Sequence, residues 1–182
     1  VSHYVTKGSE LDKEAFYRGT SIYYADQVVP MLPRELSNGI CSLNPQVDRL
    51  AFSCLMDVSF EGKLLSYRFE KSVIRSRVKG VYSEVNKIID GTADEEIKAK
   101  YARVLDRIPL MKELADILEK NRIERGAPEI DTQESKIITD ENGVCIDVKP
   151  RNTGIAEGII EEFMLMANNS AAALAMKEKI PF

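Results

Sequence analysis

The chain has few of the residues that support several common kinds of site. Its 182 residues include no tryptophan, one histidine and three cysteines. The single histidine, His3, excludes metal sites that need two histidines from this chain and argues against a Ser-His-Asp triad. The cysteines, Cys41, Cys54 and Cys145, are far apart and form no CxxC pair. We therefore interpret them as reduced thiols of a cytoplasmic protein.

Long apolar runs, a secretory leader and an excess of positive charge are also missing. No run approaches the roughly 18 apolar residues of a membrane span. The first residues, "VSHYVTKGSELDKE", show no basic start followed by an apolar stretch. The net charge of −4 argues weakly against nucleic-acid binding, although such a total can hide a local basic patch. Because the chain starts as if at the end of a strand and stops just after a helical pattern, we expect an internal segment of a longer protein.

What the sequence does contain is a mixture of helical and strand patterns. Apolar periodicity predicts helices over residues 8–19, from Thr92 to a break at Pro109, from Leu110 to about Arg125, and from about Thr153 onward. Thr92 and Glu95 form a possible capping box for the second of these helices.

Two alternating stretches predict β-hairpins. One turns at Glu61-Gly62, and the other turns at Asn142-Gly143, which favours a type I′ turn. The region from 19 to 50 has little regular structure, and its length suggests a functional or strongly packed segment. The predicted class is α+β, with antiparallel β-hairpins packed with α-helices.

The second strand of the first hairpin carries the strongest local charge signal. Between Arg68 and Lys87 six residues are basic and two are acidic. Strand alternation places Lys71, Arg75, Arg77 and Lys79 on one face. Cations spaced about 6.5–7 Å apart can follow a phosphate backbone. The alternative interpretation is a solvated edge strand that its charges protect from aggregation.

Tyrosines in two parts of the chain are further candidates for nucleic-acid contact. Tyr23 and Tyr24 lie in "GTSIYYADQVVPMLP", a loop that two prolines stiffen, and Tyr82 follows the basic strand. Each ring could stack on a base, or could cap a core with its hydroxyl in water. The acidic pair Glu161-Glu162 could hold Mg²⁺, but neighbouring acids on a helix point in different directions, so we expect no metal site there.

Several stretches, taken in order over nearly the whole chain, resemble the catalytic domain of the ribonuclease II and ribonuclease R family. They are "VSHYVTKGSELDKEAFYRGTSIYYADQVVPMLPRELSNGICSLNPQVDRLAFSC", "YRFEKSVIRSRVKGVYSEV", "KIITDENG" and "IIEEFMLMANNSAA". "VSHYV" and "RGTSIYYADQVVPMLP" are more similar to the ribonuclease R branch. The resemblance implies a processive hydrolytic exoribonuclease that uses Mg²⁺ and releases nucleoside 5′-monophosphates from the 3′ end of single-stranded RNA.

The resemblance also implies what this chain lacks. The family's aspartate-rich metal motif belongs before Val1, and its catalytic arginine and glutamate motifs belong after Phe182. We therefore expect one partial catalytic domain over residues 1–182 with no catalytic residue and no bound metal, which is inactive alone. Truncated edges predict self-association. No membrane partner is expected.

Three positions carry over from the family. Tyr23 matches a tyrosine that packs against bases near the RNA 3′ end, and Tyr82 matches a tyrosine that lines the RNA channel. In "GAPEI", Ile130 stands where the family usually has a phenylalanine that stacks on the bases, and an aliphatic side chain offers no ring face. Together with Arg75, Arg77 and Lys79, these residues form the predicted RNA-binding set. The alternatives are a non-catalytic RNA-binding scaffold with the same fold, or an α+β interaction domain without RNA.

Overall fold

Three antiparallel strand pairs and five α-helices make up the fold that the computed structural model describes for residues 1–128, 134–151 and 153–181. The helices are α1 (Glu10–Arg18), α2 (Tyr82–Ile89), α3 (Glu95–Tyr101), α4 (Ile108–Glu124) and α5 (Ile155–Glu178). The strand pairs are β1 (Ile22–Tyr23) with β2 (Val28–Val29), β3 (Asp48–Val58) with β4 (Leu64–Arg75), and β5 (Glu134–Thr139) with β6 (Cys145–Arg151). The predicted α+β class is confirmed.

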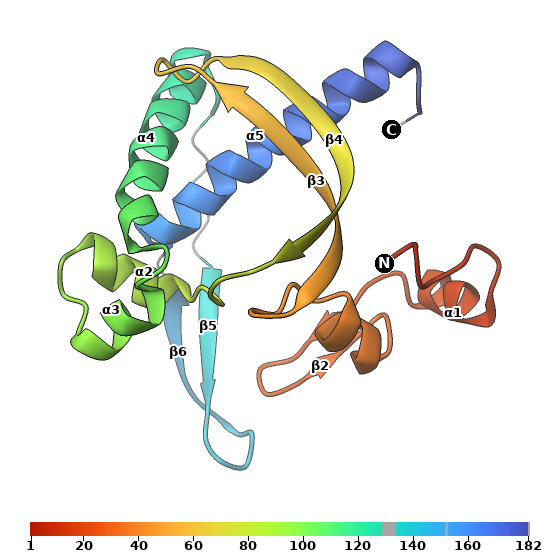
Figure 1. The fold of residues 1–182 in the computed structure, drawn as a ribbon. Coiled ribbons are helices and arrows are strands. Elements are labelled where there is room, and N and C mark those ends of the chain that lie inside the picture. The colour runs from red at the N-terminus through yellow and green to blue at the C-terminus, as the bar shows by residue number, and fades with distance from the viewer. Residues whose placement is uncertain (129–133, 152, 182) are drawn as a thin grey trace.

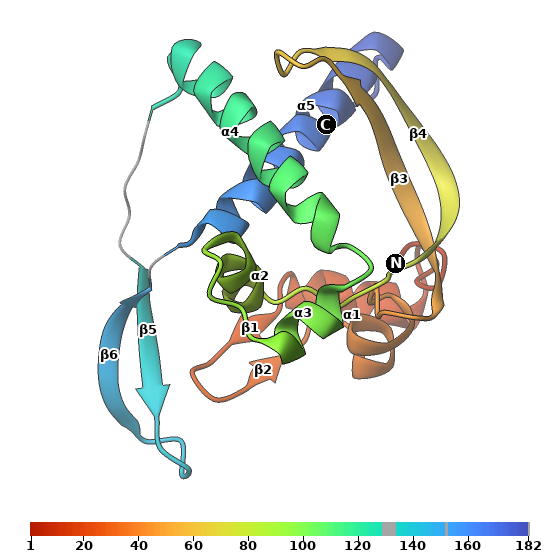
Figure 2. The same ribbon diagram turned by 60° about the vertical axis from the view of Figure 1, so that its left-hand side comes forward.

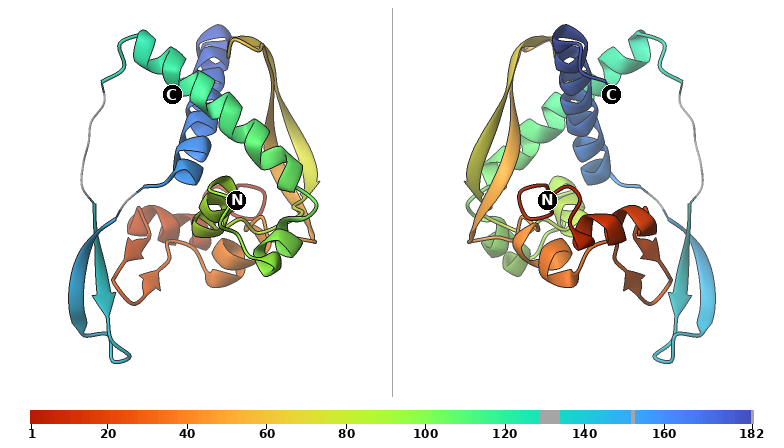
Figure 3. Two further views of the ribbon diagram at one scale, coloured as in Figure 1. Left: turned by 90° about the vertical axis from the view of Figure 1, so that its left-hand side faces the viewer. Right: turned by 90° about the vertical axis from the view of Figure 1, so that its right-hand side faces the viewer.

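The long β3–β4 hairpin curves over α5, and α4 packs across the same helix (Figure 1). Helices α2 and α3 lie at the N-terminal end of α4 (Figures 1 and 2). The β5–β6 hairpin projects away from the helices (Figure 3), and α1 lies on the opposite side of the molecule from it (Figure 1). No described helix is long and apolar enough to cross a bilayer.

The first predicted hairpin is confirmed, with its turn where the sequence placed it. Its register pairs Asp48 with Arg75 at the open end and places Gly62 in the turn. Gly62 has a φ of +75°, and a Cβ there would lie 2.7 Å from both the Asn121 amide nitrogen and an Ile117 methyl carbon. The hairpin turn therefore sits against α4, and the Asn121 amide donates to the Glu61 carbonyl at 2.8 Å.

The core lies where α2, α3 and the start of α4 meet. Ile97, Tyr101 and Ile108 are buried there with Ala93, and half-buried side chains of α2 pack against them. Ile97, Tyr101 and Ile108 recur at helical spacing within the segment that the sequence predicted as one helix from Thr92 to Pro109. The structure keeps them together but divides the segment, because α3 ends at Tyr101 and a 3₁₀ turn (Leu105–Arg107) leads into α4.

Two local predictions in this region were wrong, and one helix was not predicted. Asp94, not Thr92, caps α3, because the Asp94 carboxylate accepts the Ile97 N–H at 2.8 Å whereas Thr92 closes the turn after α2. Pro109 lies in the first turn of α4 rather than breaking a helix, because an N–H in the first turn has no partner within the helix and its absence costs no hydrogen bond. Helix α2, which starts at Tyr82, was not predicted because its eight residues are too few to show clear periodicity.

The remaining elements follow the sequence closely. Ser9 caps α1 by accepting the Asp12 N–H, and Gly19 ends it at a φ of +71°. Helix α5 begins two residues after the expected Thr153. An irregular helical segment (Glu35–Ile40), whose backbone leaves helical angles at Gly39, lies in the stretch from 19 to 50 together with the short strands β1 and β2.

The second hairpin is confirmed, but its predicted type I′ turn is wrong. Gly143 has a positive φ and Asn142 does not. A type I′ turn needs a positive φ at both central residues, so the turn is of the type I kind followed by a left-handed glycine. The Asp140 carboxylate explains this choice, because it accepts the Asn142 and Val144 N–H groups at 2.9 Å each.

Candidate nucleic-acid interface

The predicted basic strand ends earlier than the charge pattern indicated. Strand β4 stops at Arg75, so Arg77 and Lys79 lie in the connection to α2 and not on a strand face. Exposed and half-buried side chains nevertheless keep alternating through this connection, with Arg75, Arg77 and Lys79 exposed. Ser76 preserves the extended path by bridging to Pro45. The three cations thus form an exposed basic segment, Arg75–Lys79, which leads into Tyr82.

The charges of this basic segment differ in availability. Arg75 pairs with Asp48 at the open end of the hairpin, with 2.7 Å between Nε and Oδ1 and both side chains more than half exposed. This hydrogen-bonded pair raises the pKa of Arg75 and lowers the pKa of Asp48. Arg77 and Lys79 form no ion pair with any residue in the described ranges. Those two cations are therefore the ones that offer uncompensated charge to a polyanion.

Tyr82 is the first residue of α2, and its side chain is 43% exposed. It lines a cavity of about 430 Å³ together with Val78 and Val81 on its own segment and Ile159 and Ile160 on α5. The exposed fraction leaves the ring free to contact a ligand, while the apolar lining keeps one side of it against the protein.

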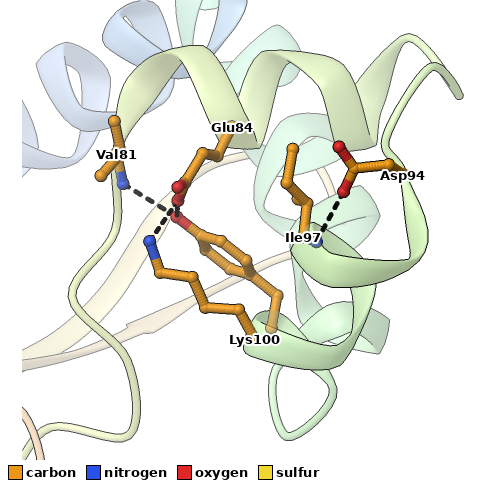
Figure 4. A network of polar contacts seen from close by, with 6 residues as sticks. Val81, Glu84, Asp94, Ile97 and Lys100 are labelled. Atoms are coloured by element: carbon orange, nitrogen blue, oxygen red, sulfur yellow. Dashed lines mark hydrogen bonds and ion pairs between the residues drawn. The ribbon is translucent and has the colours of Figure 1, made fainter.

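A polar network holds the chain just before and after Tyr82 (Figure 4). The buried Tyr101 hydroxyl accepts the Val81 N–H at 2.9 Å and donates to Glu84 Oε2 at 2.7 Å. Lys100 Nζ lies 2.5 Å from the same oxygen. Bonding to Lys100, and then to Tyr101, lowers the pKa of Glu84, and burial followed by the Glu84 bond raises the pKa of Tyr101.

Tyr23 lies on a different part of the molecule. It pairs with Val28 in the short β1–β2 ladder, and its side chain is 77% exposed. The loop is held from inside by the Ser21 hydroxyl, which accepts the Met31 N–H at 2.9 Å. The turn between these strands also approaches the β5–β6 turn, since a Cβ on Gly143 would lie 3.2 Å from Asp26 Oδ2.

The structure brings together only part of the predicted RNA-binding set. The basic segment Arg75–Lys79 and Tyr82 are continuous, whereas Tyr23 sits on the separate β1–β2 pair. Ile130 lies outside the described residues. Sequence reasoning missed Tyr101 and Glu84 as supports of Tyr82, because it counted Tyr101 as an apolar stripe residue. The one available signal was that a tyrosine at a core position needs a partner for its hydroxyl.

The described residues contain no ligand set that fits a metal ion. Across 1–128, 134–151 and 153–181 no group of three His, Cys, Asp or Glu side chains comes together. Glu162 is instead buried and pairs with Arg122 on α4, with 2.7 Å between Nε and Oε1. This contact raises the pKa of Arg122. Glu162 thus holds α4 against α5, while Glu161 beside it is exposed.

Comparison with known proteins extends over the whole chain. The family model described as "RNB domain" matches residues 1–182. Ribonuclease R 1 of Lactococcus lactis is 49% identical over 182 residues, which are 100% of this chain and 22% of that protein. Ribonuclease R of Thermotoga maritima is 45% identical over 183 residues, which are 100% of this chain and 25% of that protein. The chain therefore spans about a quarter of the length of these relatives.

A solved structure agrees with the sequence relatives. Mycoplasma genitalium RNase R in complex with ribose-methylated single-stranded RNA superposes with a TM-score of 0.89 at 30% identity, over 98% of this chain and 27% of that one. The expected part of the ribonuclease II type of catalytic fold is thus confirmed. Because the family model, the sequence relatives and the superposed backbone all agree along the length of the chain, the protein belongs to the RNB-domain family.

Proposed function

We propose that this chain is part of a processive hydrolytic exoribonuclease that degrades single-stranded RNA from its 3′ end to nucleoside 5′-monophosphates. In this proposal the chain contributes part of the RNA channel and of the base clamp. The observation that carries it is the exposed basic segment Arg75–Lys79, which runs directly into the half-exposed ring of Tyr82. The RNB membership and the complex of Mycoplasma genitalium RNase R with single-stranded RNA support the choice of ligand.

The chemistry of the interface suits an unpaired strand. Arg77 and Lys79 can each neutralise a phosphate, which favours any polynucleotide. An exposed tyrosine ring can stack on any base only when that base is unpaired, and such stacking contributes about 1–3 kcal/mol per base. Tyr82 and Tyr23 would meet bases at separate points, with Tyr23 nearer the 3′ end. Ile130 would stand at the far end of the base stack.

Hydrolysis itself would depend on residues other than those that the structure describes. Mg²⁺ would be held elsewhere in the protein, because the described residues offer no ligand set for it. The role left for this chain is to bind and orient RNA. As a partial catalytic domain it would be inactive on its own, and in its full context it would act in the cytoplasm, in keeping with its three free cysteines.

A paired nuclease assay tests this proposal. The protein at its full native length and the 182-residue chain are incubated with 5′-labelled single-stranded RNA and Mg²⁺, and the products are resolved on a sequencing gel. We expect mononucleotide release from the full-length protein and none from the chain. Release by the purified chain would contradict its inactivity, and RNA binding without hydrolysis at full length would favour the non-catalytic scaffold.

Binding is tested separately with the chain. Fluorescence anisotropy with a labelled single-stranded oligonucleotide compares the wild type with Tyr82→Ala and with the double variant Arg77→Gln and Lys79→Gln. We expect both variants to bind more weakly. Unchanged affinity in both would contradict the proposed contacts at Arg77, Lys79 and Tyr82, and no binding by the wild type would favour the α+β interaction domain that does not bind RNA.

A further inference from the structure

The short connection between β4 and α2 has few attachments to the rest of the protein. At its start, Gln46 donates from its backbone N–H to the Ser76 carbonyl at 2.9 Å and from its side chain to the Arg77 carbonyl at 2.6 Å. The next three residues, 78–80, make no hydrogen bond with the remainder of the described chain, and Gly80 has open space around it. Val78 packs against the helical core, but no hydrogen bond fixes the backbone of 78–80, so the direction in which the chain enters Tyr82 depends on the next polar contact.

Tyr101 supplies that contact. Its side chain is 1% exposed, which makes it one of the two most deeply buried side chains described, and its ring is packed among apolar residues of the helical core. Its hydroxyl is bonded to the Val81 N–H, which belongs to the residue immediately before Tyr82. Because the ring is locked in the core, the position of the hydroxyl is set by the core and not by the surface segment.

The direction of the hydrogen bonds strengthens this contact. The Tyr101 hydroxyl has one proton, and it donates that proton to Glu84 Oε2, so a lone pair faces the Val81 N–H. Lys100 neutralises the same carboxylate and lies 5.4 Å from the centre of the Tyr101 ring. Donation to a charged acceptor polarises the hydroxyl and improves it as an acceptor for Val81.

The bonds to Tyr101 bracket Tyr82. One fixes the backbone one residue before it, and the other fixes the side chain of Glu84, two residues after it, on the first turn of α2 (Figure 4). Tyr82 and Tyr101 also line the same cavity of about 430 Å³. A shift of the Tyr101 hydroxyl would therefore move the start of α2 and with it the Tyr82 ring.

We propose that Tyr101 is a positioning residue whose buried hydroxyl sets where Tyr82 meets single-stranded RNA. This inference rests on the proposed function, in which Tyr82 contacts RNA directly. Tyr101 itself touches no RNA, so its effect on binding passes entirely through Tyr82. Removal of the hydroxyl should then matter only while the Tyr82 ring is present, and that condition separates positioning from general support of the fold.

A double-mutant cycle on the protein at its full native length tests the inference. Single-stranded RNA affinity and steady-state hydrolysis are measured for the wild type, Tyr101→Phe, Tyr82→Ala and the double variant. We expect Tyr82→Ala to weaken binding by about 5- to 150-fold, as loss of one stacked base would. We expect Tyr101→Phe to weaken it by about 3- to 10-fold, as loss of one net hydrogen bond would. In the Tyr82→Ala background the same Tyr101→Phe change should have no effect.

The kinetic constants provide a second readout. Loss of positioning in the ground-state complex should raise KM in Tyr101→Phe while kcat stays within about twofold of the wild type. The matched control is Asp94→Ala, which removes the N-terminal cap of α3, the helix that ends at Tyr101, without removing either partner of the Tyr101–Val81 bond. Asp94→Ala should lower the melting temperature comparably and leave RNA affinity unchanged. If Tyr101→Phe does not fold, Glu84→Gln replaces it in the cycle, with the same dependence on Tyr82 expected.

The outcomes separate the inference from the proposed function. Unchanged affinity in Tyr82→Ala would overturn the proposed RNA contact and this inference with it. Weaker binding in Tyr82→Ala together with unchanged binding in Tyr101→Phe would overturn the inference alone. An equal loss from Tyr101→Phe in both backgrounds, or an equal loss in Asp94→Ala, would also overturn it, because the hydroxyl would then act only through stability.

Discussion

The basic segment Arg75–Lys79 makes a quantitative prediction about the salt dependence of RNA binding. Arg77 and Lys79 have no ion-pair partner in the part of the chain that the structure describes, whereas Arg75 is already paired with Asp48. Replacement of Arg77 and Lys79 by glutamine should therefore release two fewer counterions on binding, and replacement of Arg75 should change counterion release much less.

The magnitude follows from polyelectrolyte behaviour. Each phosphate neutralised on a single strand contributes a slope of about −0.7 to the dependence of log K on log salt concentration. The double variant Arg77→Gln and Lys79→Gln should then flatten the slope by about 1.4. Between 50 and 200 mM salt its affinity should fall by about sevenfold less than the wild-type affinity falls. Asp48→Asn frees Arg75 and should steepen the slope by up to about 0.7.

Anisotropy titrations with single-stranded RNA at several salt concentrations measure these slopes. Lys177→Gln is the matched control, because it removes one exposed cation near the C-terminal end of α5, away from α2 (Figure 1). If Lys177→Gln flattens the slope as much as Lys79→Gln does, the effect is one of total charge. If Arg75→Gln has the largest effect of the four cations, the account of paired and unpaired charges is wrong.

Three further predictions concern the fold. Gly62→Ala should lower the free energy of unfolding by about 2–4 kcal/mol, because the added methyl group clashes with α4 and also strains the backbone by about 1–2 kcal/mol. Gly91 has a similar φ of +72° but open space around it, so Gly91→Ala should show the backbone strain alone. Urea titrations followed by circular dichroism compare the two variants, and equal losses of stability would refute the close approach of Gly62 to α4. Because the pKa of Glu84 is lowered in the fold, its ionised carboxylate contributes fully to the stability of the protein above the ordinary glutamate pKa, and this contribution disappears as the pH falls through the pKa that Glu84 has in the folded state. The wild type should therefore lose its stability advantage over Glu84→Gln on acidification. A stability difference that stays constant with pH would argue against the network. The 182-residue chain should self-associate through the exposed face of the β3–β4 hairpin, which includes Phe52 and Val73. Sedimentation analysis should find that Phe52→Ser associates less than the wild type. A monomeric wild type would contradict the prediction.

Local chemistry decided most of the elements that the sequence predicted well. The cap at Ser9, the strand alternation on both sides of Gly62 and the left-handed stop at Gly126 are each set by one residue and its near neighbours. Errors arose where two local signals competed. Asp94 displaced Thr92 as a cap, and Asp140 displaced the expected turn at Asn142-Gly143, in both cases because a carboxylate was placed to accept backbone N–H groups.

The sequence alone determined the family, the α+β class and the position of the charge next to Tyr82, because those depend on residue identity and order along the chain. Tertiary structure alone decided which charges are available and what holds Tyr82. The Asp48–Arg75 ion pair closes the open end of the β3–β4 hairpin, and the Tyr101 hydroxyl reaches Val81 from another helix. The Tyr101–Val81 contact depends on a distance across the fold that no spacing along the chain encodes.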